Sequence, residues 1–204
     1  MSKDTIYAGG LARRAIQPGS HCYDLGCSLG AATLAMRHNV AVDGCRIIGV
    51  DNAAAMVSRC REIVAADSAP TPVEILHADI RDVPVADASM VVMNYTLQFL
   101  PPAERTSLIR RIANGTRQGG VFVLSEKVVH DDPEFDQLLI DLHHDFKRQN
   151  AYSEMEIARK RAAIENVLIP DSVATHESRL LDAGFRTAGV WLRWFNFVSI
   201  LAVR

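Results

Sequence analysis

The sequence lacks the short signatures of several common enzyme classes. It contains no G-x-S-x-G elbow, no P-loop and no H-E-x-x-H, which excludes serine hydrolases, P-loop NTPases and zincins. Its four cysteines form no C-x-x-C pair and have no histidine at zinc spacing, so we expect reduced thiols and no metal site. No segment approaches the roughly 20 apolar residues of a membrane span, and the first residues have no apolar signal-peptide core. These absences favour a cytoplasmic protein without a membrane segment.

The sequence also lacks an excess of charge of either sign. Lys and Arg number 22 and Asp and Glu number 24, so the formal net charge is −2. A protein whose main work is gripping phosphate backbones is usually basic, so we do not expect nucleic acid as a direct partner. With 204 residues, of which 49% are hydrophobic, the chain can bury one substantial core. We therefore treat residues 1–204 as a single domain.

Short β-branched runs alternate with helical patterns along much of the chain. Five strands that alternate with helices predict an α/β fold with a doubly wound parallel sheet and right-handed crossovers. Two final strands joined by a tight link add an antiparallel pair, so we expect seven strands in a mostly parallel, Rossmann-like sheet. The strands are predicted from His21 and over 45–51, 73–78, 89–96, 121–125, 187–194 and 196–203, and the helices over 31–39, 53–66, 102–114 and 171–183.

Residues 133–168 interrupt this alternation. They are predicted to form two consecutive helices, over 133–148 and 153–168, with no strand between them. We interpret them as a helical insertion over the edge of the sheet that binds ligand. In the first helix His143 and His144 point about 100° apart, so they cannot easily chelate one ion. Surface or interface positions suit them better, and the insertion is a candidate dimer face.

A glycine turn follows the first strand and opens the helix after it. Asp24 closes the strand, and Gly26 and Gly30 let the backbone approach a ligand closely. The spacing Asp-x-Gly-x-x-x-Gly differs from the G-x-G-x-x-G fingerprint that seats a pyrophosphate. A carboxylate at Asp24 would repel a pyrophosphate but suits an ammonium-bearing ligand, such as an amino acid attached to a nucleoside. The turn therefore predicts a nucleoside site of this kind.

Polar residues end the next strands of the predicted sheet. Asp51 lies about 20 to 25 residues past the glycine turn, where α/β nucleotide folds place the carboxylate that binds ribose hydroxyls. Asp79 ends the third strand, and Asn94 lies near the end of the fourth. Each of these alone is also explained by an ordinary solvated loop. Together with Asp24, the carboxylates of Asp51 and Asp79 place three acids at one edge of the sheet and favour a ligand site, because ligands bind at the carboxyl ends of parallel strands.

One arginine of the insertion falls on an apolar helix face. Arg161 projects into the same stripe as Ile157, Ile164 and Leu168, where a guanidinium needs an anion. That anion is either part of a ligand or a structural carboxylate, unless the side chain reaches water instead. By contrast, Glu126 is interpreted with Lys127 as an exposed pair and is given no role. The aromatic residues of the last strands are expected to be core: Trp191, Trp194, Phe195 and Phe197.

Taken together, these motifs resemble the carboxy-S-adenosyl-L-methionine synthase family, within the class I methyltransferase-like superfamily. The likeness covers nearly all of the chain from about Pro18 onward. The glycine turn alone indicates only the superfamily, whereas the histidine-containing helix and the Lys-Arg pair are specific to the narrower family. The residues that carry it are Asp24 to Gly30, Asp51-Asn52, Asp79 to Asp82, Asn94 to Leu100, Ser125 to Lys127, His143 to Arg148 and Lys160-Arg161.

The resemblance implies an enzyme that binds S-adenosyl-L-methionine without being an ordinary methyltransferase. In this family prephenate loses its carboxyl group to give phenylpyruvate, and the deprotonated methyl group of the sulfonium captures the carbon dioxide. A partner enzyme, a tRNA carboxymethyltransferase, uses the product to modify wobble uridine. We also expect a homodimer and no metal. Two alternatives stay open: a methyltransferase acting on a small molecule or tRNA, and a non-catalytic subunit that presents an S-adenosyl compound.

Ligand roles follow from the resemblance motif by motif. It places Gly26, Cys27 and Ser28 at the methionine end, Asp51 with Asn52 at the ribose, Asp79 and Ile80 at the adenine, Asn94 near the sulfonium and Arg161 at the new carboxylate. Arg161 would thus be the residue that distinguishes the carboxylated ligand from plain S-adenosyl-L-methionine, because a guanidinium can donate two parallel hydrogen bonds to a carboxylate. The family also has a longer N-terminal segment with a tyrosine that reaches the ligand. No such role is carried over to Tyr7, because residues 1–16 are too few to contain that segment.

Overall fold

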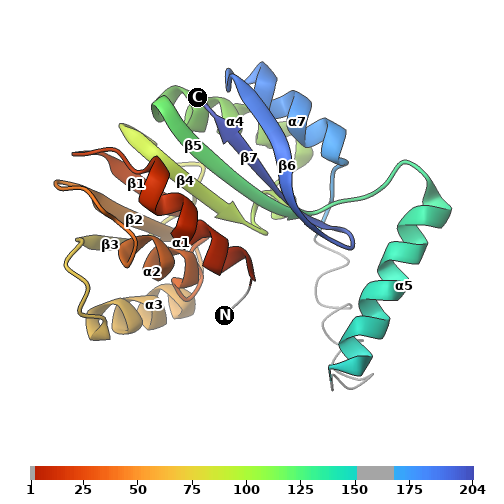
Figure 1. Cartoon of the computed structure of the whole chain (residues 1–204), viewed down its shortest axis with the longest axis horizontal. Helices are drawn as coiled ribbons and strands as arrows, with labels where there is room; N and C mark the ends of the chain where they lie inside the picture. Colours follow the sequence, from red (N-terminus) through yellow and green to blue (C-terminus); the bar gives the residue numbers. More distant parts are fainter. Residues whose placement is uncertain (1–2, 151–167) are drawn as a thin grey trace.

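A seven-stranded sheet forms the centre of the molecule, as the sequence predicts (Figure 1). The computed structural model describes residues 3–150 and 168–204. The strand order is β3-β2-β1-β4-β5-β7-β6; the first five strands are parallel, and β7 runs antiparallel to both β5 and β6. The strands are β1 (His21–Leu25), β2 (Arg46–Asp51), β3 (Val73–His77), β4 (Ala88–Asn94), β5 (Thr116–Lys127), β6 (Thr187–Trp194) and β7 (Phe197–Val203).

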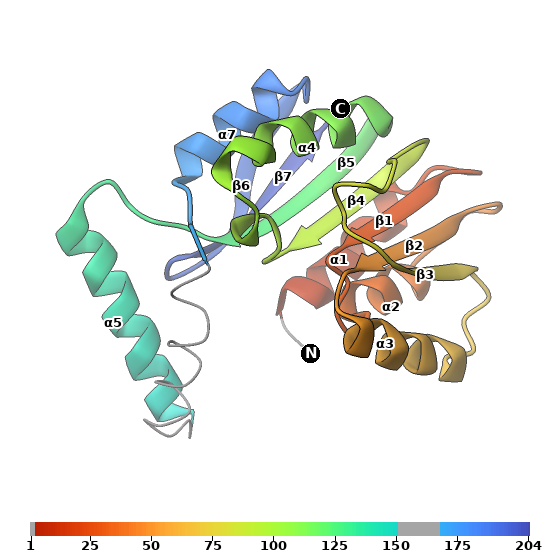
Figure 2. The same cartoon turned by 180° about the vertical axis from the view of Figure 1, so that it is seen from behind.

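Helices cover both faces of this sheet. Figure 1 looks onto α1 (Lys3–Ala15) and α2 (Ala31–Arg37), and α3 (Ala54–Ala66) lies along the β2 and β3 end. Figure 2 shows α4 (Pro102–Gly115) and α7 (Val173–Asp182) on the opposite face. A short 3-10 helix, η1 (Leu97–Phe99), connects β4 to α4. None of the described helices is long and apolar enough to cross a membrane.

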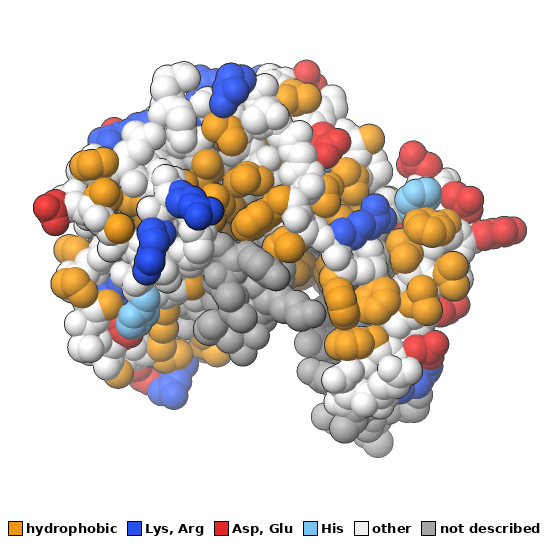
Figure 3. Space-filling model, in the orientation of Figure 1, with side chains coloured by type: hydrophobic (Ala, Val, Ile, Leu, Met, Phe, Trp, Pro, Cys, Tyr) orange, Lys and Arg blue, Asp and Glu red, His pale blue; other side chains and the backbone are white. Residues whose placement is uncertain are grey.

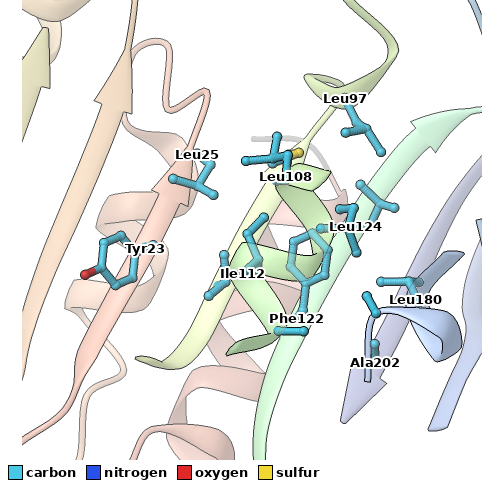
Figure 4. Packing of buried hydrophobic residues seen from close by; sticks show 14 of the residues in the cluster. Tyr23, Leu25, Leu97, Leu108, Ile112, Phe122, Leu124, Leu180 and Ala202 are labelled. Carbon is cyan, nitrogen blue, oxygen red and sulfur yellow. The ribbon is translucent and has the colours of Figure 1, made fainter. Parts of the chain in front are cut away.

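Apolar side chains fill the space between the sheet and its helices. The periodic positions of α4, Leu108, Ile109 and Ile112, are buried against the middle of the sheet (Figure 4). Phe122 of β5 stacks on Phe185 in the same cluster, with ring centroids 5.8 Å apart. A second cluster packs α1 and α2 on the other face. With both faces covered, β4 is buried over nearly its whole length, as expected of a central parallel strand.

Helix α5 (Pro133–Gln149) forms the described part of the insertion. Asp132 caps it by accepting hydrogen bonds from two backbone N–H groups of the first turn, and Pro133 occupies the first turn. The helix stands beside the tip of the β6–β7 hairpin, away from the other helices (Figures 1 and 2). None of its residues is buried, and apolar side chains gather on its surface in Figure 3. The second predicted helix, 153–168, lies almost entirely outside the described residues.

The hairpin aromatics correct one prediction. Trp191 is half-buried against the second apolar cluster, but Trp194, Phe195 and Phe197 are not core residues, and Trp194 is 45% exposed. Instead, these three rings meet α5: Phe146 lies edge-on to Trp194 at 5.4 Å, and His143 lies edge-on to Phe197 at 4.9 Å and near Phe195 at 5.8 Å. The hairpin strands β6 and β7 lie at one edge of the sheet, and α5 is the described helix that these three rings contact. Their aromatic residues therefore form the contact between the sheet and the insertion.

Candidate functional site

A cavity of about 370 Å³ opens at the carboxyl ends of the parallel strands. That volume lies in the range of small-molecule sites. Its walls come from the loops that follow β1 to β4, so residues far apart in the sequence meet there. The lining residues are Gly26, Ser28, Asp51, Asn52, Ala78, Asp79, Ile80, Arg81, Asn94, Tyr95, Thr96, Phe99, Leu100 and Pro101.

Seven of the ten residues predicted to bind ligand therefore line one cavity. They are Gly26, Ser28, Asp51, Asn52, Asp79, Ile80 and Asn94. Asp24 and Cys27 do not line it, and Arg161 lies outside the described residues. Helix α5 contributes no lining residue either. The described part of the chain holds no cluster of three potential metal ligands, and His143 instead packs against the hairpin aromatics.

Gly26 brings the turn after β1 into contact with the loop after β4. Its φ is +84°, a conformation that favours glycine. A Cβ placed on Gly26 would overlap Thr96 Oγ1 and lie only 2.7 Å from Thr96 Cγ2. Thr96 is held in turn by a hydrogen bond of 3.0 Å from its hydroxyl to the carbonyl oxygen of Asn94. A glycine is thus required here both by backbone conformation and by close approach.

Asp24 caps the helix that follows the turn and does not line the cavity. The side chain is 2% exposed, and its Oδ2 accepts hydrogen bonds from the Thr33 backbone N–H at 2.9 Å and the Thr33 hydroxyl at 2.6 Å. Burial raises the pKa of Asp24 to about 6. Its carboxylate orients the turn from behind.

Cys27 is also buried, at 5% exposed, and its side chain is directed into the sheet. Its sulfur would lie 3.2 Å from a Cβ placed on Gly49 of β2, so the thiol fills the space that this glycine leaves. Burial raises the pKa of the Cys27 thiol well above its ordinary value. All four cysteines are free and buried, in agreement with the expectation of reduced thiols.

Asp51 joins the turns that follow β1 and β2. Its Oδ2 accepts a hydrogen bond of 2.9 Å from the Ser28 backbone N–H, and its Oδ1 accepts one of 2.9 Å from the Ala53 backbone N–H. A carboxylate has about four acceptor positions, so both oxygens retain capacity for a ligand hydroxyl. The side chain that the sequence places at the ribose therefore also sets the shape of the turns around it.

Asp79 is paired within the protein. Its two carboxylate oxygens accept hydrogen bonds from the Arg81 guanidinium at 2.9 and 2.6 Å, and Arg81 also bonds Glu104 at 2.6 Å. The hydrogen bonds from Arg81 hold the pKa of Asp79 below its ordinary value. Arg81 lies in the cavity wall beside Asp79, so the charge of this carboxylate is paired within the protein.

Asn94 supplies an unused acceptor to the cavity wall. Its Oδ1 is buried and has no hydrogen-bond partner among the residues that the structure describes. A buried amide oxygen without a partner costs free energy, which a ligand group can recover. The segment that follows is also unusual, because Tyr95 has a φ of +55°. Both residues line the cavity.

Glu126 and Arg105 hold this wall from behind, and the sequence prediction missed both. Glu126 is fully buried, which contradicts its interpretation as half of an exposed pair; its carboxylate accepts three backbone N–H bonds from residues 96–98. Burial raises the pKa of Glu126 to about 8, and these hydrogen bonds together with Arg105 oppose that shift. Arg105 is also fully buried and lies on the apolar face of α4.

Comparison with known proteins identifies a family match, relatives of high identity and solved structures of the same fold. Residues 23–120 match the family model described as a methyltransferase domain. The carboxy-S-adenosyl-L-methionine synthase of Aliivibrio fischeri (strain MJ11) is 56% identical over 96% of this chain and 81% of its own length. The enzyme of that name from Escherichia coli (strain K12 / DH10B) is 52% identical over 96% of this chain and 79% of its own length. Among solved structures, the cyclopropane synthase MmaA2 from Mycobacterium tuberculosis shares the fold, with a TM-score of 0.66, 16% identity and coverage of 92% of this chain and 62% of that chain.

Proposed function

The chain belongs to the carboxy-S-adenosyl-L-methionine synthase family, and from that premise we propose that it makes this compound from S-adenosyl-L-methionine and prephenate. Phenylpyruvate is the second organic product. The structural observation that most supports an S-adenosyl ligand is the buried, unpartnered Oδ1 of Asn94 in the cavity wall. An amide oxygen carries partial negative charge, so it suits a neighbouring sulfonium, whereas a phosphate would be repelled.

The other lining residues divide the cavity into parts that fit the rest of the ligand. Gly26 and Ser28 would receive the methionine end, where the bare backbone of the turn lets the ligand approach. Asp51 and Asn52 would bind the ribose, and Asp79 with Ile80 would contact the adenine. Cys27 and Asp24 would act from behind, by shaping the turn. The cavity holds no unpaired cationic cluster for a pyrophosphate, because its Arg81 is bound to Asp79 and Glu104.

The chemistry requires few proton-transfer groups from the protein. The bound sulfonium supplies an acidic methyl group that can take up the carbon dioxide lost by prephenate. Atom balance then requires the hydroxyl lost from prephenate and the methyl proton to leave together as water. The protein has to bring the two substrates together and exclude bulk water from the site. Arg161 would bind the new carboxylate, a role that rests on the family resemblance because this residue lies outside the described part of the chain.

The proposal extends to the use of the product. A tRNA carboxymethyltransferase would take the carboxylated compound and modify wobble uridine, so this chain need not bind RNA itself. Its formal charge of −2 supports that division of labour. We further propose a cytoplasmic homodimer in which the insertion contributes to the contact.

Mass spectrometry of the nucleoside after incubation of the protein with S-adenosyl-L-methionine and prephenate tests the proposal. We expect an added carboxyl group that depends on both substrates and on the protein. Unchanged S-adenosyl-L-methionine would refute synthase activity, and methyl transfer to an added acceptor would favour the methyltransferase alternative. Product formation by the isolated chain would eliminate the non-catalytic alternative.

A further inference from the structure

The wall segment, residues 95–101, supplies five of the fourteen residues that line the cavity. They are Tyr95, Thr96, Phe99, Leu100 and Pro101. The segment contains only the three-residue helix η1, so its own backbone hydrogen bonds do little to fix it. Its position must come from its surroundings.

Glu126 holds the N–H side of the wall segment. One carboxylate oxygen accepts hydrogen bonds from the backbone N–H groups of Thr96 at 3.2 Å and Leu97 at 2.9 Å, and the other accepts one from Gln98 at 3.2 Å. Gln98 returns the contact, because its Oε1 accepts a hydrogen bond of 3.2 Å from the Lys127 backbone N–H. The end of β5 and the wall segment are therefore connected in both directions.

Arg105 holds the C=O side of the same segment. Its guanidinium donates to the carbonyl oxygen of Gln98 at 3.2 Å and to that of Leu100 at 2.9 and 3.0 Å. The same group donates to the Ile169 carbonyl oxygen at 2.7 Å and forms an ion pair with Asp171 at 2.8 Å. A buried guanidinium with five donors can satisfy all of these acceptors, which a lysine with a single nitrogen cannot.

The chain on both sides of the insertion is connected to Glu126 and Arg105. Lys127 follows Glu126 and leads towards α5, whereas Ile169 and Asp171 lie where the described chain resumes after the insertion. The two ends also meet directly, because Val129 donates a backbone hydrogen bond of 3.3 Å to Asp171. The buried side chains of Glu126 and Arg105 thus connect the cavity wall to the chain on both sides of the insertion.

We propose that Glu126 and Arg105 are positioning residues for S-adenosyl-L-methionine: they fix the wall segment in its binding conformation and align it with both ends of the insertion. Neither residue lines the cavity. The inference rests on the proposed ligand but not on prephenate. If either residue is altered, the wall segment samples conformations that do not bind, so the apparent Kd rises by the inverse of the competent fraction.

Glu126→Gln tests the role of the Glu126 carboxylate, because glutamine keeps the shape of the side chain but directs an NH2 group towards at least one of the three N–H donors. We expect the Kd for S-adenosyl-L-methionine, measured by calorimetry on the full chain, to rise about tenfold with unchanged stoichiometry. Backbone amides 96–98 should exchange hydrogen faster in the free variant and regain protection at saturating ligand. Arg105→Lys should raise the Kd in the same way.

Two kinds of control separate positioning from general destabilisation. Glu62→Gln and Arg59→Lys alter an exposed ion pair on α3 and should leave the Kd unchanged. Ile112→Val removes a buried methylene from α4 and should lower the Tm without changing the Kd. If Glu126→Gln does not fold, Gln98→Met removes the bond to Lys127 and is measured in its place.

A Kd within twofold of the native value in both Glu126→Gln and Arg105→Lys, or native exchange at amides 96–98, would overturn the inference. So would a rise in Kd of equal size in Ile112→Val. These measurements use S-adenosyl-L-methionine alone. A failure to use prephenate would therefore refute the proposed synthesis while leaving the positioning role intact. Conversely, product formation together with a native Kd in both variants would refute the positioning role while leaving the proposed synthesis intact.

Discussion

We expect Gly26→Ala to weaken S-adenosyl-L-methionine binding by disturbing the turn and the wall segment together. The variant must hold a φ of +84° and avoid Thr96, whose Cγ2 and Cβ would lie 2.7 and 2.9 Å from the new methyl group. The left-handed conformation costs an alanine about 1 to 2 kcal/mol. Displacement of Thr96 breaks its hydrogen bond to the Asn94 carbonyl oxygen, which is worth about 1 kcal/mol.

These costs sum to about 2 to 3 kcal/mol, and the free variant can avoid them by moving the turn and Thr96 apart. Binding then has to restore the original geometry, so the Kd should rise roughly 30- to 150-fold. Calorimetric titration with S-adenosyl-L-methionine measures this directly. Thr96→Ala removes the two nearest atoms, so Gly26→Ala should cost less in that background.

Gly19→Ala provides a matched control. Gly19 also has a positive φ, +64°, but a Cβ there would meet nothing within 4 Å. This variant should lose about 1 to 2 kcal/mol of unfolding free energy and keep its affinity. The reasoning is refuted if Gly26→Ala binds within threefold of the native Kd, or if Gly19→Ala loses as much affinity.

Three further predictions concern single groups. Asp51→Asn should raise the Kd for S-adenosyl-L-methionine at least tenfold, because the new NH2 group faces the Ser28 or Ala53 N–H. Asp43→Asn, at an exposed position, should leave the Kd unchanged, and equal effects of the two substitutions would contradict a role of Asp51 in binding. Burial lowers the pKa of His176 to about 4, so acidification charges this side chain more readily in the unfolded chain. From pH 6.5 to 4 the unfolding free energy should therefore fall by on the order of 3 kcal/mol more than in His176→Gln. An equal loss of unfolding free energy in both proteins, measured by urea unfolding, would disprove this. Arg161→Ala should weaken the carboxylated ligand selectively, and equal loss for both ligands in a titration would contradict the proposed role.

The sequence predicts the sheet well because its signals are local. Each parallel strand is a short apolar run that ends at a polar residue, and all five such runs fold as strands with the expected order of helices between them. Asp51, Asp79 and Asn94 reach one cavity for the same reason, since parallel strands deliver their carboxyl ends to one edge. Asp24 lies further from that edge, because it pairs with Gly49, two positions before Asp51, and its carboxylate caps the helix that follows the turn.

Glu126 could not be assigned from its neighbours alone. Its burial depends on three N–H groups of a segment about 30 residues earlier, which only the folded chain brings together. Arg105 did carry a signal, because it precedes Leu108, Ile109 and Ile112 at helical spacing and so falls on their apolar face. The same reasoning that selected Arg161 would have found it. Trp194, Phe195 and Phe197 were misplaced because composition does not say which element packs against the end of a strand.

The central claim is that this protein carboxylates the methyl group of S-adenosyl-L-methionine. Mass spectrometry after incubation with S-adenosyl-L-methionine and prephenate labelled with carbon-13 in its ring carboxyl group tests it most directly. We expect the nucleoside to gain one carbon dioxide that carries the label, in equal amount to the phenylpyruvate formed. A nucleoside of unchanged mass, or a gained carboxyl group without the label, would contradict it.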